Sequence, residues 1–234
     1  MEIKGFIDMS LVDWDDRVSS VIFLPRCTFR CPFCYNVALV LKPDELPTID
    51  LAEIEAYLRR HRGAIDGIVI TGGEPTVHDD LPDLCRRLKE MGFSVKIDTN
   101  GTNPNMVKRL IDEGLVDYIA MDVKAPLNEF DYSRAAGIDV RAMLPRVRET
   151  INILMKSNIE YEFRTTLVPT IHKKGDVEKI CKLLMGCRRY VLQRFMSEVE
   201  TINPKFKELK PFSDAEMKSF LEEARRYIPN AKIR

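Results

Sequence analysis

Short apolar runs alternate with longer helical patterns along most of the chain, and this alternation limits the possible folds most strongly. Several of the runs are almost continuously apolar, as strands buried on both faces should be. Strands separated by helices predict a parallel sheet with right-handed crossovers. Six runs are predicted as strands: Val18–Leu24, Gly67–Thr71, Ser94–Asp98, Val116–Asp122, Tyr161–Val168 and Tyr190–Phe195.

Capping residues stand between these runs and predict where helices begin and end. Gly92 and Gly114 are placed to end two helices, and Pro145 is placed to open another. Three more helix starts are predicted from residue pairs: Asp50 with Glu53, Asn103 with Pro104, and Ser213 with Glu216.

Six strand–helix units are fewer than the eight of a closed barrel. The sequence therefore predicts an α/β fold, an open partial (β/α)6 barrel, with a flat doubly wound sheet as the alternative. Residues 1–234 show no linker, internal repeat or low-complexity segment, which predicts a single domain.

Charge and hydropathy limit the partners and the compartment. Lys+Arg and Asp+Glu both number 36, so no basic excess favours a nucleic acid partner. The N-terminus lacks the pattern of a signal peptide, and no apolar run approaches the ~20 residues of a membrane span. We therefore expect a cytoplasmic protein, in which cysteines are more often ligands or catalysts than disulfides.

Polar and glycine-rich segments follow the predicted strands. In parallel α/β folds the ligand site lies at the carboxyl ends of the strands. We therefore expect these segments to lie close together at the carboxyl ends of the strands. They are Cys27–Asn36, Thr71–Pro75, Asp98–Gly101, Asp122–Lys124, Arg164 and Gln193–Arg194.

Three of the six cysteines, Cys27, Cys31 and Cys34, lie at C-x3-C-x2-C spacing after the first predicted strand. Thiolates at this spacing suit a soft metal centre. A four-iron cluster has four corners, so three cysteines leave one iron open to an exchangeable ligand. Structural zinc held by two of the cysteines with distant residues, or plain reduced thiols, are the alternatives.

The other strand ends carry groups suited to a polar ligand. Gly72 and Gly73 allow backbone to approach a ligand, Glu74 can accept from an ammonium group, and Lys124 suits a carboxylate. An ordinary turn or pairing at a strand end would explain each of these residues as well. Oxygen ligands that could hold a small monovalent cation are Asp98, Thr99 and Asp122.

The motif from Cys27 to Cys34 resembles that of the radical S-adenosylmethionine superfamily, whose signature is C-x3-C-x-aromatic-C. The resemblance covers nearly the whole chain. It extends to the activating enzymes of glycyl radical enzymes, in particular those of anaerobic (class III) ribonucleotide reductase. The supporting stretches are Gly5–Asp13, Cys34–Asn36, Thr71–Pro75, Asp98–Gly101, Asp122–Lys124 and Leu192–Phe195.

The resemblance implies that Cys27, Cys31 and Cys34 ligate one [4Fe-4S] cluster whose open iron chelates S-adenosylmethionine. Where related activases have a histidine on the last strand, this chain has Gln193 or Arg194. The implied cofactor contacts are Phe33 to the adenine, Asn36 near the cluster, Gly72, Gly73 and Glu74 to the methionyl ammonium, Lys124 and Arg164 to the carboxylate or ribose, and Asp98, Thr99 and Asp122 to a cation or polar network.

The resemblance also implies an oxidoreductase that makes a 5′-deoxyadenosyl radical, which generates a glycyl radical on a partner enzyme. No cysteine-rich ferredoxin-like insert follows the cluster motif, since the loop Lys42–Thr48 leads into the first helix. We therefore expect an external electron donor such as flavodoxin or ferredoxin. The alternatives are a radical enzyme acting on a small molecule or RNA, as deazaguanine synthases do, and a non-catalytic iron–sulfur or zinc module.

Overall fold

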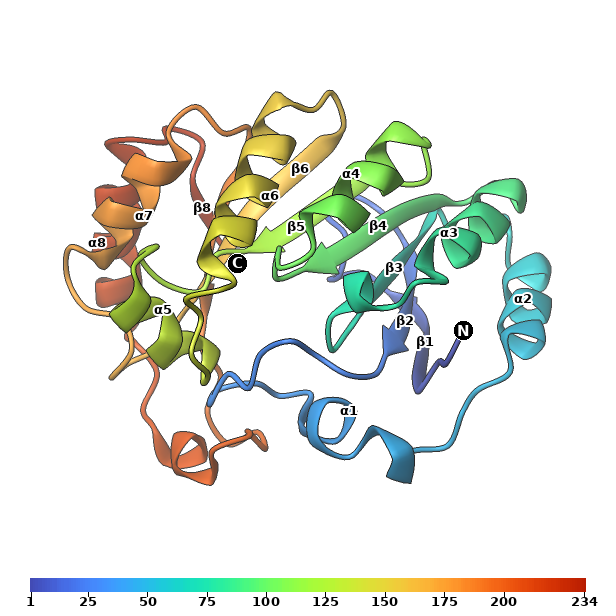
Figure 1. Cartoon of the computed structure of the whole chain (residues 1–234), viewed down its shortest axis with the longest axis horizontal. Coiled ribbons are helices and arrows are strands. Elements are labelled where there is room, and N and C mark those ends of the chain that lie inside the picture. Colours follow the sequence, from blue (N-terminus) through green and yellow to red (C-terminus); the bar gives the residue numbers. More distant parts are fainter. The chain divides into compact units, whose positions relative to one another are not determined.

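The computed structural model describes residues 1–234 and contains one open sheet of eight strands (Figure 1). Neighbouring strands follow the order of the sequence. This order has no reversal point, so the doubly wound alternative is wrong. The α/β fold with an open sheet is confirmed, with two strands more than the six expected. The strands are β1 (Gly5–Ser10), β2 (Ser19–Leu24), β3 (Gly67–Gly72), β4 (Ser94–Thr99), β5 (Tyr118–Asp122), β6 (Glu160–Leu167), β7 (Tyr190–Arg194) and β8 (Lys232–Ile233).

The two additional strands lie at the ends of the strand order and carry weak sequence signals. β1 pairs antiparallel with β2, and its register shifts between Ile7 and Ser10. Its residues Ile7, Asp8 and Met9 are all exposed, so the strand lacks the apolar alternation that sequence reasoning needs. β8 is two residues long and pairs parallel with β7, which is too short for any periodic pattern.

The predicted helix signals lie where helices begin and end. Asp50 accepts a hydrogen bond from the Ala52 backbone at the start of α2, and Ser213 with Glu216 forms a full capping box at α8. Two helices, α1 and α5, were not predicted. The helices are α1 (Val37–Leu41), α2 (Leu51–Arg60), α3 (Leu81–Glu90), α4 (Pro104–Asp112), α5 (Glu129–Ala136), α6 (Leu144–Lys156), α7 (Asp176–Leu184) and α8 (Asp214–Arg225). Short 3₁₀ turns cover Pro43–Glu45, Pro75–Val77 and Pro204–Glu208.

The chain divides into two compact units, neither continuous in sequence. The first unit comprises Met1–Thr28, Ala38–Thr99 and Asn105–Ile119. In it β2, β3 and β4 pair in parallel, and residues on both faces of these strands, such as Val21, Val69 and Val95, are fully buried. Helices α2 and α3 contribute Ile54, Leu58, Leu84 and Leu88 to its buried core.

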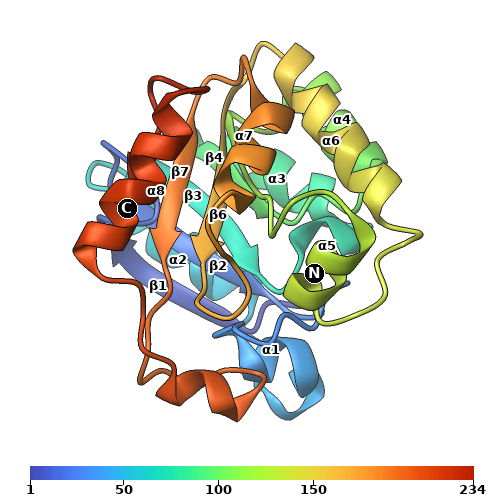
Figure 2. The ribbon, with the colours of Figure 1, turned by 90° about the vertical axis from the view of Figure 1, so that its left-hand side faces the viewer.

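The second unit comprises Phe29–Val37, Asn100–Pro104 and Ala120–Arg234. In it β6 and β7 pair in parallel, and α7 and α8 lie beside them (Figure 2). Its core includes Phe163, Val191 and Leu192 from the strands with Ile151 and Ile180 from the helices. The expectation of a single domain over residues 1–234 stays a prediction.

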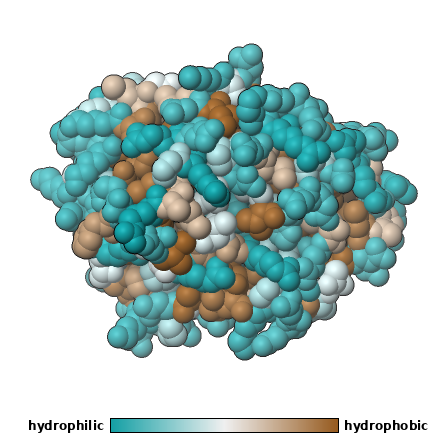
Figure 3. Space-filling model, in the orientation of Figure 1, coloured by the Kyte–Doolittle hydropathy of each residue, from teal (hydrophilic) through white to brown (hydrophobic).

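The face shown in Figure 3 is mostly hydrophilic, with hydrophobic side chains in small separate groups. None of the helices has both the length and the apolar character needed to cross a membrane.

Candidate cluster and cofactor site

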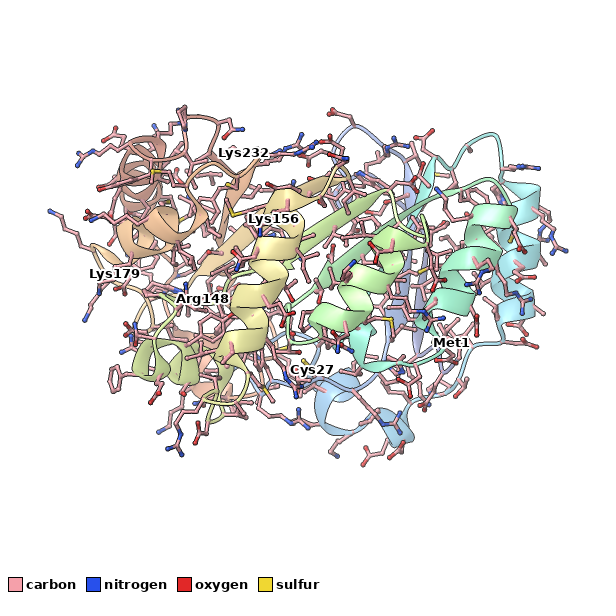
Figure 4. The ribbon with its side chains drawn as sticks, turned by 45° about the horizontal axis from the view of Figure 1, so that its top comes forward. Met1, Cys27, Arg148, Lys156, Lys179 and Lys232 are labelled. Carbon is pink, nitrogen blue, oxygen red and sulfur yellow. The ribbon has the colours of Figure 1, made fainter.

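The three motif cysteines lie on the loop that leads from β2 to α1, where Figure 4 labels Cys27. Cys31 is buried, Cys27 and Cys34 are half-buried, and none of the three forms a disulfide. The loop crosses the two units, with Cys27 in the first and Cys31 and Cys34 in the second.

In the first unit, three successive carbonyls at the base of the loop are each held by the Gly72–His78 segment. The Gly73 amide donates to the Leu24 carbonyl at 2.8 Å, and the Glu74 amide donates to the Arg26 carbonyl at 2.7 Å. Between them, His78 Nε2 donates to the Pro25 carbonyl at 2.8 Å. The residues immediately before Cys27 are thereby fixed in position.

The two glycines are explained by this close approach. A Cβ on Gly73 would stand 1.8 Å from the Arg26 carbonyl oxygen, closer than any real Cβ contact. Gly72 has a φ of 115°, and a Cβ there would stand 2.4 Å from the Leu24 carbonyl oxygen. Because backbone lies at both positions, the glycines are needed to seat the cluster loop.

Glu74 is buried, with 1% of its surface exposed. Its Oε1 accepts from the Thr99 hydroxyl at 2.6 Å and from the Thr76 backbone amide at 3.2 Å, and also from the Thr76 hydroxyl. Two predicted site residues, Glu74 and Thr99, are thus in direct contact. A carboxylate held by three donors is fixed in orientation, as a ligand-binding group must be.

Asp98 is paired with a buried lysine that the sequence analysis missed. Lys96 Nζ lies 3.4 Å from Asp98 Oδ1, donates to the Asp13 carbonyl, and stands 5.7 Å from the centre of the Tyr118 ring. Thr71 Oγ1 is 3.5 Å from Asp98 Oδ2. The sequence does contain a signal for this pair. Lys96 stands two residues before Asp98 inside an apolar strand, and alternate residues of a strand lie on the same face.

In the second unit, Asp122 lies between two cations. Its Oδ2 accepts from Lys124 Nζ at 2.8 Å, and its Oδ1 accepts from Arg164 Nε at 2.8 Å. Burial by itself would raise the pKa of Asp122, but Arg164 and Lys124 lower it well below the ordinary value. The three predicted residues therefore form one charged cluster.

Lys124 also interacts electrostatically with two cysteines of the motif, Cys31 and Cys34. Burial opposes its charge, but Asp122, and then the Cys31 and Cys34 sulfurs, raise its pKa. In the reverse direction, burial raises the pKa of Cys34, while the Asn36 amide and Lys124 lower it. Lys124 is thus placed to offset negative charge on two of the three sulfurs, and its role toward a carboxylate stays a prediction.

A strap from residues 196 to 203 holds the far side of the loop. The Ile202 amide donates to the Cys34 carbonyl at 3.2 Å, and the Asn203 amide donates to the Pro32 carbonyl at 2.9 Å. The Tyr35 hydroxyl also bonds to the Met196 backbone, at 2.6 Å from its nitrogen and 3.2 Å from its oxygen. Sequence reasoning missed this strap because nothing in its composition indicates a contact with a loop more than 150 residues earlier.

The remaining predicted residues occupy varied positions. Phe33 is buried and Asn36 is half-buried, both on the loop itself. Arg194 pairs with Asp214 at the start of α8, and Gln193 is half-buried. A contact of Gln193 or Arg194 with a nucleoside stays a prediction.

A resident cation has no support in the structure. The structure contains no group of three or more His, Cys, Asp or Glu side chains that could hold a metal ion. The cation expected at Asp98, Thr99 and Asp122 therefore stays an unsupported prediction. The chemistry of the loop nevertheless fits an iron–sulfur cluster: three reduced thiols lie on one short loop, and a lysine offsets the charge of two of them.

A family model for the radical SAM superfamily matches residues 21–184. A Methanocaldococcus jannaschii protein, provisionally named a glycyl-radical enzyme activating enzyme, is 34% identical over 99% of this chain and 95% of its own length. A 7-carboxy-7-deazaguanine synthase of Thermococcus kodakarensis is 32% identical over 60% of this chain and 52% of its own.

Among solved structures, a domain of pyruvate-formate lyase-activating enzyme from Bacteroides vulgatus has a similar fold. Its TM-score is 0.57 at 14% identity, over 72% of this chain and 98% of that one. At this identity the likeness concerns the fold alone.

Proposed function

Because the chain belongs to the radical SAM superfamily, we propose that it generates a glycyl radical on a partner enzyme, with anaerobic ribonucleotide reductase as that partner. Membership in this family of enzymes implies S-adenosylmethionine and a [4Fe-4S] cluster, and it removes the non-catalytic alternative. The observation that carries the proposal is the 34% identity to the activase-like relative over 99% of the chain.

When bound, the cluster and S-adenosylmethionine would supply the radical chemistry that generates the glycyl radical on the partner. We assign Cys27, Cys31 and Cys34 as the cluster ligands. Lys124 would offset the charge on the sulfurs, since Cys31 and Cys34 already raise its pKa. The Glu74 carboxylate, fixed by Thr76 and Thr99, would accept the methionyl ammonium.

Other contacts to S-adenosylmethionine are proposed on the same basis. Gly72 and Gly73 would present backbone to it, Phe33 would contact the adenine, and Asn36 would bond beside the cluster. Arg164 would face the carboxylate or ribose from the charged cluster that it forms with Asp122 and Lys124. Electrons would come from a flavodoxin or ferredoxin, in an anaerobic cytoplasm.

Electron paramagnetic resonance tests the proposal. The reconstituted chain, reduced with dithionite and given S-adenosylmethionine, should produce a glycyl radical doublet on the candidate ribonucleotide reductase. A Cys34→Ser variant is the control and should give no doublet, because one cluster ligand is gone. Cleavage of S-adenosylmethionine by the wild-type chain with no radical on the partner would refute the assignment.

A second function is favoured by one observation, the 32% identity to the deazaguanine synthase over 60% of the chain. It predicts that cofactor turnover depends on a small molecule. Measuring 5′-deoxyadenosine release with either a glycyl radical enzyme or the small-molecule substrate of a deazaguanine synthase separates the two functions. An RNA substrate is disfavoured by the equal numbers of basic and acidic residues.

A further inference from the structure

Helix α5 ends beside the cluster loop, at a glycine that no sequence motif marks. Gly137 follows the helix with φ 71° and ψ 16°, and its amide donates to the Ser133 carbonyl. This left-handed geometry is a common way for a helix to end. Figure 1 shows the end of α5 close to the blue loop that carries the cysteines.

The contact between them is backbone against backbone. The Arg30 amide donates to the Ala136 carbonyl, the last residue of α5, at 2.8 Å. A Cβ on Gly137 would stand 1.9 Å from the Arg30 carbonyl oxygen and 3.4 Å from the Cys31 nitrogen. No side-chain rotation can relieve such a clash, so any other residue at position 137 must displace Arg30 and Cys31.

The neighbouring contacts leave the loop little freedom to yield. On one side, Phe29 is buried against Tyr132 of α5, with ring centres 6.1 Å apart. On the other side, the Ile202 and Asn203 amides hold the Cys34 and Pro32 carbonyls. Cys31 thus lies between two anchors within the same compact unit.

We propose that Gly137 is a positioning residue for the cluster loop. The absence of a side chain lets the end of α5 bond to Arg30 and so sets the backbone from which the Cys31 sulfur projects. The inference rests on the proposed function, because a displacement of Cys31 would affect cluster binding only if Cys31 ligates a cluster. The ordering of the loop by α5 can be measured without a cluster.

A matched pair of variants tests the proposal. Gly137→Ala adds both a left-handed alanine and a clash with Arg30. Gly114→Ala adds a left-handed alanine at φ 64°, where nothing lies within 4 Å of the new Cβ. Gly137→Asn is the third variant, because asparagine tolerates left-handed backbone but still carries a Cβ.

The first readout is amide hydrogen exchange of the metal-free chain, followed by mass spectrometry of peptides that cover residues 27–36. Gly137→Ala and Gly137→Asn should accelerate exchange there about tenfold, while Gly114→Ala should leave it unchanged. The second readout is iron and sulfide per chain after anaerobic reconstitution, together with the resonance spectrum of the reduced cluster. Both should change only in the two Gly137 variants.

Each outcome decides the proposal. Equal effects in Gly137→Ala and Gly114→Ala, or rescue by Gly137→Asn, would reduce the role of Gly137 to backbone strain and overturn it. Loss of folding in both Gly137 variants alone would make the contact a requirement of the whole fold and also overturn it. A wild-type chain that binds no iron would refute the proposed function. Amide hydrogen exchange would still measure whether the contact between Gly137 and Arg30 orders the loop.

Discussion

At the residue scale, the Asp122 carboxylate holds two cations, Lys124 and Arg164, one on each oxygen. Without the Asp122 carboxylate, the positive charges of Lys124 and Arg164 would lie near each other with little access to water. Its pKa lies below the ordinary value of 3.8, so the stability that it contributes is present at neutral pH and is lost only as the pH falls below that value. The charge cluster is therefore intact under the conditions of the proposed reaction.

Asp122→Asn should lower the free energy of unfolding by about 1–3 kcal/mol at pH 7, because a partly buried carboxylate partner of two cations is removed. Urea denaturation of the metal-free chain measures the change. The matched control is Asp139→Asn, which breaks the exposed pair of Asp139 with Arg141 and should leave the urea midpoint unchanged. Equal midpoints for all three proteins would contradict this account of the cluster.

At the element scale, His172 joins the turn after β6 to the segment after β5. Its Nδ1 accepts from the Val168 amide at 3.0 Å, so its proton lies on Nε2, which donates to the Lys124 carbonyl at 2.9 Å. Burial lowers the pKa of His172 below its ordinary 6.5, and Arg134 acts in the same direction, while its hydrogen bonds and Asp176 oppose the shift. A second proton would have to bind Nδ1, where it would repel the Val168 amide hydrogen and break that hydrogen bond.

The stability of the chain should therefore fall as the pH drops below 6.5. The unfolded state takes up a proton there that the folded state resists, which costs at most about 1.4 kcal/mol per pH unit for one group. Urea midpoints measured between pH 5.5 and pH 8 test this. His172→Gln should be less stable at pH 8 but show a flatter dependence, and a slope equal to that of the wild type would remove His172 as its source.

At the scale of the whole molecule, three cysteines lie on the cluster loop, where Cys31 is buried, and three lie elsewhere in the chain. Cys85, Cys181 and Cys187 are buried in the cores of the units, and burial raises their pKa values to about 12, 12 and 11. Cys27 and Cys34 on the loop are half-buried. Cys27 and Cys34 therefore combine partial exposure with a place in the candidate site.

Thiol labelling should reproduce this division. At pH 8 a thiol with a pKa of about 12 is ionised in about one molecule in ten thousand, and one with a pKa of about 11 in about one in a thousand. Iodoacetamide should therefore spare Cys85, Cys181 and Cys187 in the folded, metal-free chain. Peptide mass spectrometry should find Cys27 and Cys34 modified first and all six modified in concentrated urea. Labelling of Cys85 as fast as Cys27 in the folded chain would contradict the burial described here.

Much of the fold could be predicted from local patterns. The six strands β2 to β7 and the helix starts at Asp50, Pro104 and Ser213 follow from residue periodicity and capping, which act over a few neighbouring residues. β1 and β8 could not be predicted, because an irregular edge strand and a two-residue strand acquire their conformation from pairing with β2 and β7.

By itself, the sequence determined the chemistry: the three thiols, their spacing, and the carboxylates and lysine that follow the strands. Only the tertiary structure decided what holds them. The Gly73 backbone lies against the Arg26 carbonyl, and the Gly137 backbone lies against the Arg30 carbonyl. The Asn203 amide donates a hydrogen bond to the Pro32 carbonyl. These are contacts between backbone groups far apart in the chain. Backbone amides and carbonyls are the same in every residue, so their partners depend on the path of the chain and leave no mark in the sequence of side chains.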